Sequence, residues 1–195
     1  MSETGSVKFS YQQVRVPVAD FAGFQELNAC RCKLLQLRLV GVGSDGISFG
    51  NLSVRDHERS GFFITGSGTG GVAHLEPEHC AKVIAYDFGR NWLRSQGVTI
   101  ASSESLTHAA IYEADESASS VIHCHNAHMW ERLREVVPTT SAEVEYGTPQ
   151  MAQEVKRLFA TTAVKETKLF IMAGHANGVI AFGTSFEEAL GILTC

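Results

Sequence analysis

The chain has 195 residues, a net charge of −5 and 44% hydrophobic residues, which is ordinary for a single globular domain over residues 1–195. The acidic balance, without any basic stripe, argues against nucleic acid as a ligand, and no stretch is apolar enough to cross a membrane. The polar N-terminus and five cysteines without zinc-finger spacing lead us to expect free thiols and a cytoplasmic protein.

The first third of the chain predicts a helix followed by a pair of strands. Apolar residues recur at helical spacing over about 19–40, and two glycines end that pattern. Strands are expected over 47–54 and 62–65, joined by a polar hairpin tip. A glycine-rich turn, 66–71, follows the second strand directly.

The middle of the chain predicts two helices and a buried strand. Pro77 indicates the start of a short helix through about Tyr86, and residues 91–100 are expected to be extended. Ser103 is expected to be the N-cap of the next helix. The run 120–126, which contains the pattern His-x-His, is then expected to be a strand.

The last third predicts two helices that enclose a pair of strands. Thr148 and Pro149 supply an N-cap and a first-turn proline for a helix through about Phe159. Strands are expected over 168–172 and 179–182, and a capping box at Ser185 opens the last helix. Helices and strands that interleave in this way predict an α/β sandwich with a mixed sheet.

The triplet His123-Cys124-His125 lies inside one of these strands. Alternate strand residues share a face, so the two imidazoles lie together, and Cys124 packs on the opposite side. His175, in a turn after a later strand, would complete three imidazoles, as in catalytic zinc sites with an open position. An isolated histidine is more often structural, and we regard His108 and His128 in that way.

Two segments have the chemistry of an anion site. The glycine-rich turn can present backbone N–H groups, with the Ser67 hydroxyl beside them, and Ser102 and Ser103 lie at an expected helix N-terminus. The alternative is a flexible hairpin loop. Glu104, in the first turn of that helix, is either a helix-capping carboxylate or a general base beside a metal.

These segments, in this order, resemble the class II aldolase/adducin family. Gly50-Asn51-Leu52-Ser53-Val54-Arg55 resembles its Gly-Asn-aliphatic-Ser-x-Arg motif, and Thr65-Gly66-Ser67-Gly68 its phosphate loop. Ser102-Ser103-Glu104, with His108 and Tyr112, resembles its Ser-Ser-Glu helix, and the histidine triplet its zinc strand. The resemblance covers nearly the whole chain.

The resemblance implies a three-layer α/β/α sandwich around a mixed, mostly antiparallel sheet, and a homotetramer with active sites between subunits. It also implies a divalent metal, with Zn2+ expected and iron, cobalt, nickel and manganese left open. The implied metal ligands are His123, His125 and His175, and the implied acid/base is Glu104. The implied phosphate-binding residues are Ser48, Asn51, Ser67, Gly68, Ser102 and Ser103.

Three positions depart from the family pattern. Gly66 and Asn126 replace usual prolines, and the third-ligand His-Gly motif reads His175-Ala176-Asn177-Gly178. Tyr146 is a candidate for the tyrosine that some members contribute from their tail.

The function that follows from the resemblance is an aldolase-type lyase. It would cleave a small phosphorylated or acidic sugar derivative through a metal-stabilised enediolate. The same site would serve a dehydratase or epimerase of a sugar phosphate. A non-catalytic adducin-like scaffold is the alternative from another class.

Overall fold

The protein is described by a computed structural model over residues 8–58 and 60–194. Its centre is an eight-stranded sheet in the order β1-β7-β6-β5-β4-β8-β10-β9, beside a two-stranded sheet of β2 and β3. The strands are Ser10–Val14 (β1), Gly41–Val42 (β2), Ser48–Phe49 (β3), Asn51–Arg55 (β4), Phe62–Thr65 (β5), Cys80–Asp87 (β6), Trp92–Gln96 (β7), Ser120–His125 (β8), Leu169–Ile171 (β9) and Gly178–Gly183 (β10). Only β1 and β7 pair in parallel; the other neighbours in the large sheet are antiparallel.

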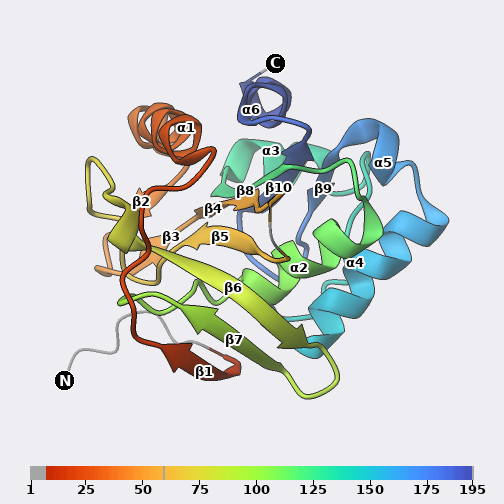
Figure 1. Cartoon of the computed structure of the whole chain (residues 1–195). Coiled ribbons are helices and arrows are strands. Elements are labelled where there is room, and N and C mark those ends of the chain that lie inside the picture. The colour runs from red at the N-terminus through yellow and green to blue at the C-terminus, as the bar shows by residue number, and fades with distance from the viewer. Residues whose placement is uncertain (1–7, 59, 195) are drawn as a thin grey trace.

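Helices cover both faces of this sheet (Figure 1). α1 (Phe24–Gln36) and α6 (Phe186–Thr194) pack on one face, and α2 (Ser105–Ala114) and α4 (Pro149–Thr161) on the other. The shorter elements are η1 (Pro77–His79), α3 (Ala127–Leu133) and α5 (Val164–Thr167). The predicted three-layer α/β/α sandwich with a mixed, mostly antiparallel sheet is therefore confirmed.

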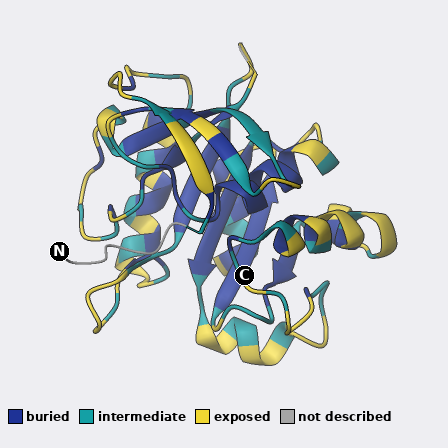
Figure 2. Ribbon diagram, turned by 90° about the horizontal axis from the view of Figure 1, so that it is seen from below, coloured by how far each residue is buried: buried dark blue, intermediate teal, exposed yellow. Residues whose placement is uncertain are grey.

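The two cores divide the side chains of each central strand. On β8, Val121 packs in the core beneath α2 and α4, whereas Ile122 and Cys124 pack in the core beneath α1 and α6. The same alternation runs along β10, so both faces of the central strands are buried, as the dark strands in Figure 2 show. The expected orientation of Cys124 away from its flanking histidines is confirmed.

Local signals fix several helix ends. The Thr148 hydroxyl accepts a hydrogen bond from the Met151 N–H at 3.3 Å, and Pro149 is the first residue of α4. The Ser185 hydroxyl likewise accepts a hydrogen bond from the Glu188 N–H at 3.2 Å, just before α6 begins. Both predicted helix starts are confirmed, because each depends on residues adjacent in sequence. The capping box at Ser185 is only half formed, since the Glu188 carboxylate accepts from the Thr184 N–H at 2.8 Å instead.

The helix expected from Pro77 to Tyr86 is wrong. Pro77 opens only a single 3-10 turn, and the chain then enters β6. β6 pairs with β5 on one side and β7 on the other, so sheet pairing outweighs the local proline signal.

Three other expected boundaries differ from the structure. The strand expected over 47–54 is divided into β3 and β4, which belong to different sheets. The first helix is shorter than residues 19–40, since α1 covers only Phe24–Gln36. Ser103 is not the N-cap of α2, because that position is taken by Glu104. β1 and α3 were not predicted: β1 is a largely exposed edge strand, and α3 is only seven residues long.

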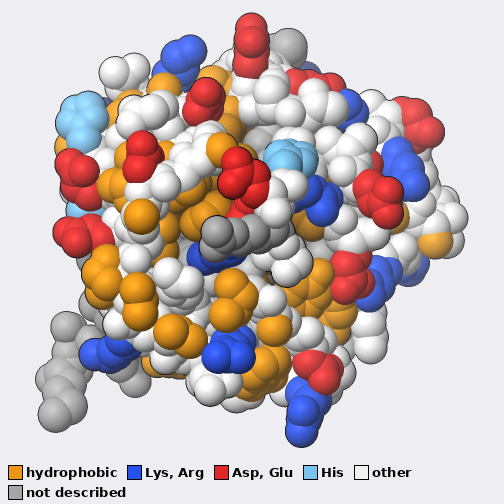
Figure 3. Space-filling model, viewed as in Figure 1, with side chains coloured by type: hydrophobic (Ala, Val, Ile, Leu, Met, Phe, Trp, Pro, Cys, Tyr) orange, Lys and Arg blue, Asp and Glu red, His pale blue; other side chains and the backbone are white. Residues whose placement is uncertain are grey.

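The structure holds four free thiols, at Cys30, Cys32, Cys80 and Cys124, as expected. Cys195 lies outside the described residues. On the face drawn in Figure 3, the acidic and basic side chains of the described residues are interspersed. Within residues 8–58 and 60–194, no helix has the length and apolar character needed to span a bilayer.

Candidate metal centre

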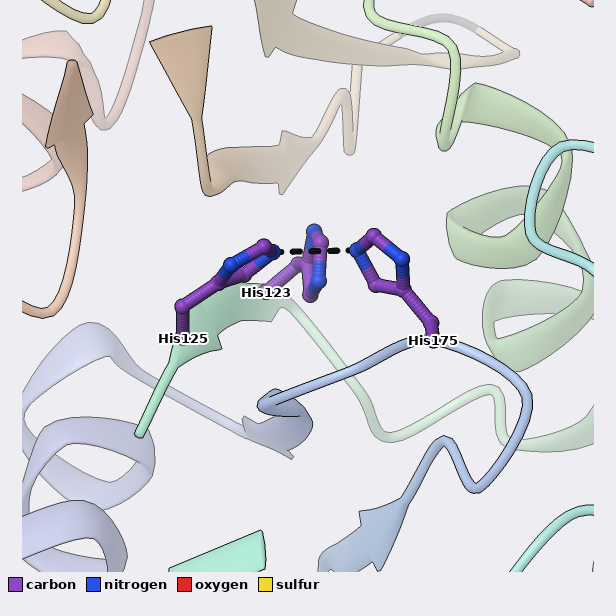
Figure 4. A group of neighbouring side chains, drawn as sticks. All are labelled: His123, His125 and His175. Carbon is purple, nitrogen blue, oxygen red and sulfur yellow. Dashed lines mark hydrogen bonds between the residues drawn. The ribbon is translucent and has the colours of Figure 1, made fainter. Parts of the chain in front are cut away.

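Three histidines meet at the end of β8. His123 and His125 project from that strand, and His175 comes from the loop between β9 and β10 (Figure 4). One ring nitrogen from each lies within 4.8 Å of the others, and Nε2 of His125 is 3.0 Å from Nε2 of His175. The structure thus brings together the three residues that the sequence singled out.

The altered loop around His175 accounts for its position. A tight turn runs from the His175 N–H, which donates to the Met172 carbonyl at 3.1 Å, to the Gly178 N–H, which donates to the His175 carbonyl at 2.8 Å. A Cβ at Gly178 would lie only 2.6 Å from the His175 ring. Asn177 takes the left-handed conformation in this turn, with φ 66°, which asparagine tolerates well.

All three imidazoles are held in the neutral form at pH 7. Burial lowers the pKa of His175 to about 3, helped by His125 and Lys8. Burial also lowers the pKa of His123 and His125. Neutral imidazole is the form that ligates a metal.

The donor set fits a divalent metal. His123 Nε2 is buried with no hydrogen-bond partner among the described residues, and each of the three neutral rings has one nitrogen lone pair that can ligate a metal. The 3.0 Å between the nitrogens of His125 and His175 is close to the roughly 3.3 Å between two ligands of tetrahedral zinc. A cation would satisfy the His123 nitrogen, which has no partner among the described residues, and would join it to the nitrogens of His125 and His175.

Glu104 is buried beside the cluster, with a side chain only 2% exposed. Thr107 donates to its Oε2 at 2.8 Å, while Oε1 has no partner among the described residues. Burial raises the pKa of Glu104 to about 7, against smaller lowering effects from Thr107 and Lys8. A carboxyl with this pKa can both give and take a proton near neutral pH.

β4 aligns the site through one of its faces. Asn51, Ser53 and Arg55 alternate along the strand and therefore point to the same side. Asn51 Nδ2 lies 3.2 Å from Nδ1 of His123, and Ser53 Oγ lies 2.7 Å from Nδ1 of His108. These contacts join the Gly-Asn-aliphatic-Ser-x-Arg segment to the histidine strand and to the helix that follows Glu104.

The same face also fixes α2 at its far end. Ser53 Oγ is 2.8 Å from the Tyr112 hydroxyl, and Arg55 donates to the carbonyls of Tyr112 and Asp115, each at 2.9 Å. His108 is fully buried, and burial lowers its pKa to about 3. This packing agrees with the prediction that His108 is structural. His128, by contrast, is exposed and contacts Arg132.

A cavity of about 550 Å³ joins the histidines to the expected anion-binding residues. It is lined by all ten residues proposed from the sequence, namely Ser48, Asn51, Ser67, Gly68, Ser102, Ser103, Glu104, His123, His125 and His175. Tyr146 also lines it, and its ring centroid is 4.3 Å from that of His175. The Nζ of Lys8 lies 3.8 Å from the centroid of the Tyr146 ring.

The glycine-rich turn is less open to an anion than its sequence suggests. The N–H groups of Gly66 and Ser67 donate to the carbonyls of His79 and Ile100, both at 2.8 Å. The Gly70 N–H donates to the Ser48 hydroxyl at 3.2 Å, so Ser48 tethers the turn. Within the part of the chain that the structure describes, the Gly68 N–H has no partner, so it and the nearby serine hydroxyls are the remaining donors.

Arg31 holds this turn from α1, a role that the sequence did not reveal. Its side chain is buried and donates to the carbonyls of Thr69 at 2.7 Å, Gly70 at 3.2 Å and Val72 at 2.5 Å. A charged residue on the apolar face of a predicted helix is the one signal that could have indicated it.

The fold and this cavity define an α/β protein with a three-histidine, one-carboxylate site. The family model described as Class II Aldolase and Adducin N-terminal domain matches residues 35–195. The chain belongs to this family. A search of curated proteins gives no significant match.

Solved structures share the fold at low sequence identity. An L-fuculose 1-phosphate aldolase is 21% identical with a TM-score of 0.69, covering 91% of this chain and 82% of that chain. A sugar-phosphate aldolase from Thermotoga maritima is 15% identical with a TM-score of 0.64, covering 88% of each chain. YgbL from Escherichia coli, whose description leaves aldolase, epimerase and decarboxylase activities open, is 20% identical with a TM-score of 0.63, covering 88% of this chain and 83% of that chain.

Proposed function

We propose that this protein is a divalent-metal-dependent aldehyde-lyase that cleaves a small phosphorylated or acidic sugar derivative. The observation that carries the proposal is the meeting, in one cavity, of three neutral imidazoles and a buried carboxyl whose pKa is about 7. A non-catalytic scaffold would gain nothing from a buried carboxyl oxygen and a buried imidazole nitrogen that both lack partners among the described residues.

His123, His125 and His175 would hold the metal, which we propose to be zinc. When bound, the metal would polarise the substrate carbonyl and offset the negative charge of an enediolate. Asn51 would orient His123: turning its amide by half a turn lets Oδ1 accept the Nδ1 proton, which leaves Nε2 for the metal.

Glu104 would move the proton. Glu104 lines the cavity; Thr107 holds its Oε2, and its Oε1 has no partner among the described residues. In the cleavage direction it would take the proton from the substrate hydroxyl as the carbon–carbon bond breaks, and then return it to the enediolate carbon. Its pKa near 7 matches both transfers.

The substrate's oxyanion would be held by neutral donors, with the Gly68 N–H and the hydroxyls of Ser67 and Ser103 in direct contact. Asn51 and Ser102 line the same cavity, and Ser48 would act by tethering the turn. Such contacts supply positioning rather than chemistry. The proposed partners are a small hydroxy-carbonyl substrate and further copies of this chain. The proposed location is the cytoplasm.

A homotetramer with sites between subunits is proposed from the family resemblance. Three large apolar side chains near the cavity remain about half exposed: Leu37 at 52%, Val42 at 46% and Ile47 at 49%. Surfaces of this kind are typical of subunit contacts. A sedimentation mass equal to that of one chain would contradict this part of the proposal.

The direct test of the lyase is turnover with and without metal. Zinc-reconstituted protein, incubated with ketose 1-phosphates, should release an aldehyde and dihydroxyacetone phosphate, and removal of the metal by a chelator should abolish this release. Chromatography of the remaining sugar phosphate would reveal epimerisation, the second activity that YgbL's description keeps open. Full activity in verified metal-free protein would refute the proposal.

A further inference from the structure

Arg38 occupies a backbone position that favours glycine. It follows the last turn of α1 and has a φ of 58°. Two hydrogen bonds form a Schellman motif there. The Leu39 N–H donates to the Leu34 carbonyl at 2.9 Å, and the Arg38 N–H donates to the Leu35 carbonyl at 3.0 Å. Two of the three other left-handed non-glycine residues in the described chain are asparagines, which tolerate this conformation. An arginine there is strained, and strain of this kind is kept where a side chain has a use.

No contact within the fold explains the guanidinium. Arg38 is exposed, and its side chain makes no hydrogen bond, ion pair or ring contact with residues 8–58 or 60–194. By contrast, Arg31 and Arg55 each spend their donors on several backbone carbonyls.

Arg38 is the one arginine or lysine among the described residues that line the 550 Å³ cavity. The other charged residues of the lining, Asp45 and Glu104, are both acidic. The Leu39 carbonyl, next to Arg38, accepts the His125 N–H at 2.8 Å, so the strained turn is joined to the histidine strand. Apart from the proposed metal, Arg38 is therefore the one permanently charged cation that the described lining offers to an anionic substrate, opposite two acidic side chains.

We propose that Arg38 is a specificity-determining residue that binds the oxyanion of the substrate. The inference rests on the proposed function and deepens it: the substrate is a hydroxy-carbonyl compound carrying a terminal phosphate or carboxylate, which a guanidinium contacts through two donors. The hydroxyls of Ser67 and Ser103 position this group, and Arg38 supplies its counter-charge.

The test is anion binding by zinc-reconstituted protein, measured by calorimetry with two probes. The probes are 2-phosphoglycolate, which carries a phosphate, and tartronate, which carries only carboxylates. Arg38→Gln should weaken the preferred probe about tenfold or more, which is the size expected for a charge-assisted contact. Arg15→Gln, at an exposed arginine outside the cavity, should leave both affinities unchanged.

Arg38→Gly separates a binding role from a structural one. Glycine relieves the left-handed backbone, so this variant should unfold at a higher temperature than the wild type while losing the same affinity as Arg38→Gln. The inference is overturned when Arg38→Gln and Arg38→Gly bind both probes as the wild type does, or when the wild type binds neither.

The two proposals fail in different ways. Zinc content, measured on every variant, reports on the metal site, and it should be the same in wild type and Arg38→Gln. If the wild type holds no zinc, the proposed function fails, and inorganic phosphate binding by the same metal-free variants still decides the role of Arg38. If zinc binds and the Arg38 variants bind both probes with the wild-type affinity, this inference alone fails.

Discussion

Glu104 is the residue on which the proposed chemistry depends most. It is 2% exposed, has one oxygen bonded to Thr107 and leaves the other without a partner. The side-chain oxygens of a structural helix cap accept hydrogen bonds from backbone N–H groups. Within the described residues, the Glu104 side chain forms no such bond. The arrangement costs stability and suits proton transfer.

Glu104→Gln keeps the shape of the side chain and removes the acid/base. We expect turnover to fall by about 10² to 10⁴-fold, because general acid–base catalysis contributes that much. Zinc content should stay at the wild-type level. Glu116→Gln, at an exposed surface position, is the matched control and should keep full turnover.

The same variant has a pH signature in metal-free protein. The folded pKa of Glu104, about 7, lies above its ordinary value of 4.5, so its stabilising contribution is present below pH 4.5 and is lost as pH rises to 7. Glu104→Gln should therefore gain stability over the wild type across this window, by about 3 kcal/mol at pH 7. Urea unfolding at several pH values measures the difference, and a gap independent of pH would contradict the burial of an ionisable carboxyl.

At the scale of elements, two pieces of secondary structure hold the cavity in shape. β4 contacts His123, His108 and the end of α2 from one face, and α1 holds the glycine-rich turn through Arg31. The family motifs on β4 and α2 are thus one interlocked unit, in which Asn51 faces the histidines and Arg55 fixes the helix end.

Arg31→Met should loosen the glycine-rich turn. It removes the donor from three backbone carbonyls, and we expect a loss of roughly 3 kcal/mol in unfolding free energy with weaker binding of inorganic phosphate. Arg90→Met is the control, because Arg90 is exposed and its side chain makes no hydrogen bond or ion pair within the described residues. Equal urea midpoints for the two variants would show that the hydrogen bonds from Arg31 to these carbonyls do not stabilise the fold.

The elements that the sequence predicted are those with strong local signals. α4 and α6 begin at side-chain caps, and β8 contains β-branched Val121 and Ile122 ahead of the alternating histidines. β6 could not be predicted, because its neighbours β5 and β7 decide its conformation against the signal of Pro77. β1 has no apolar alternation and exists through its parallel pairing with β7.

At the scale of the whole molecule, the site depends on contacts between distant segments. His123 and His125 could be paired from strand geometry alone, whereas the approach of His175 depends on the antiparallel pairing of β8 with β10. Arg38 carries no sequence signal, because neither its left-handed backbone nor its place in the cavity can be read from neighbouring residues. The resemblance to the family supplied the expected order of the motifs, but it did not indicate Arg38.

The central claim is that the three histidines form a metal site. Equilibrium dialysis against zinc, followed by metal analysis, tests it most directly. The wild type and His128→Ala, which changes an exposed histidine away from the cavity, should hold stoichiometric zinc, and His123→Ala combined with His125→Ala should hold none. Zinc retained in full by that double variant, or absent from the wild type, would contradict the account.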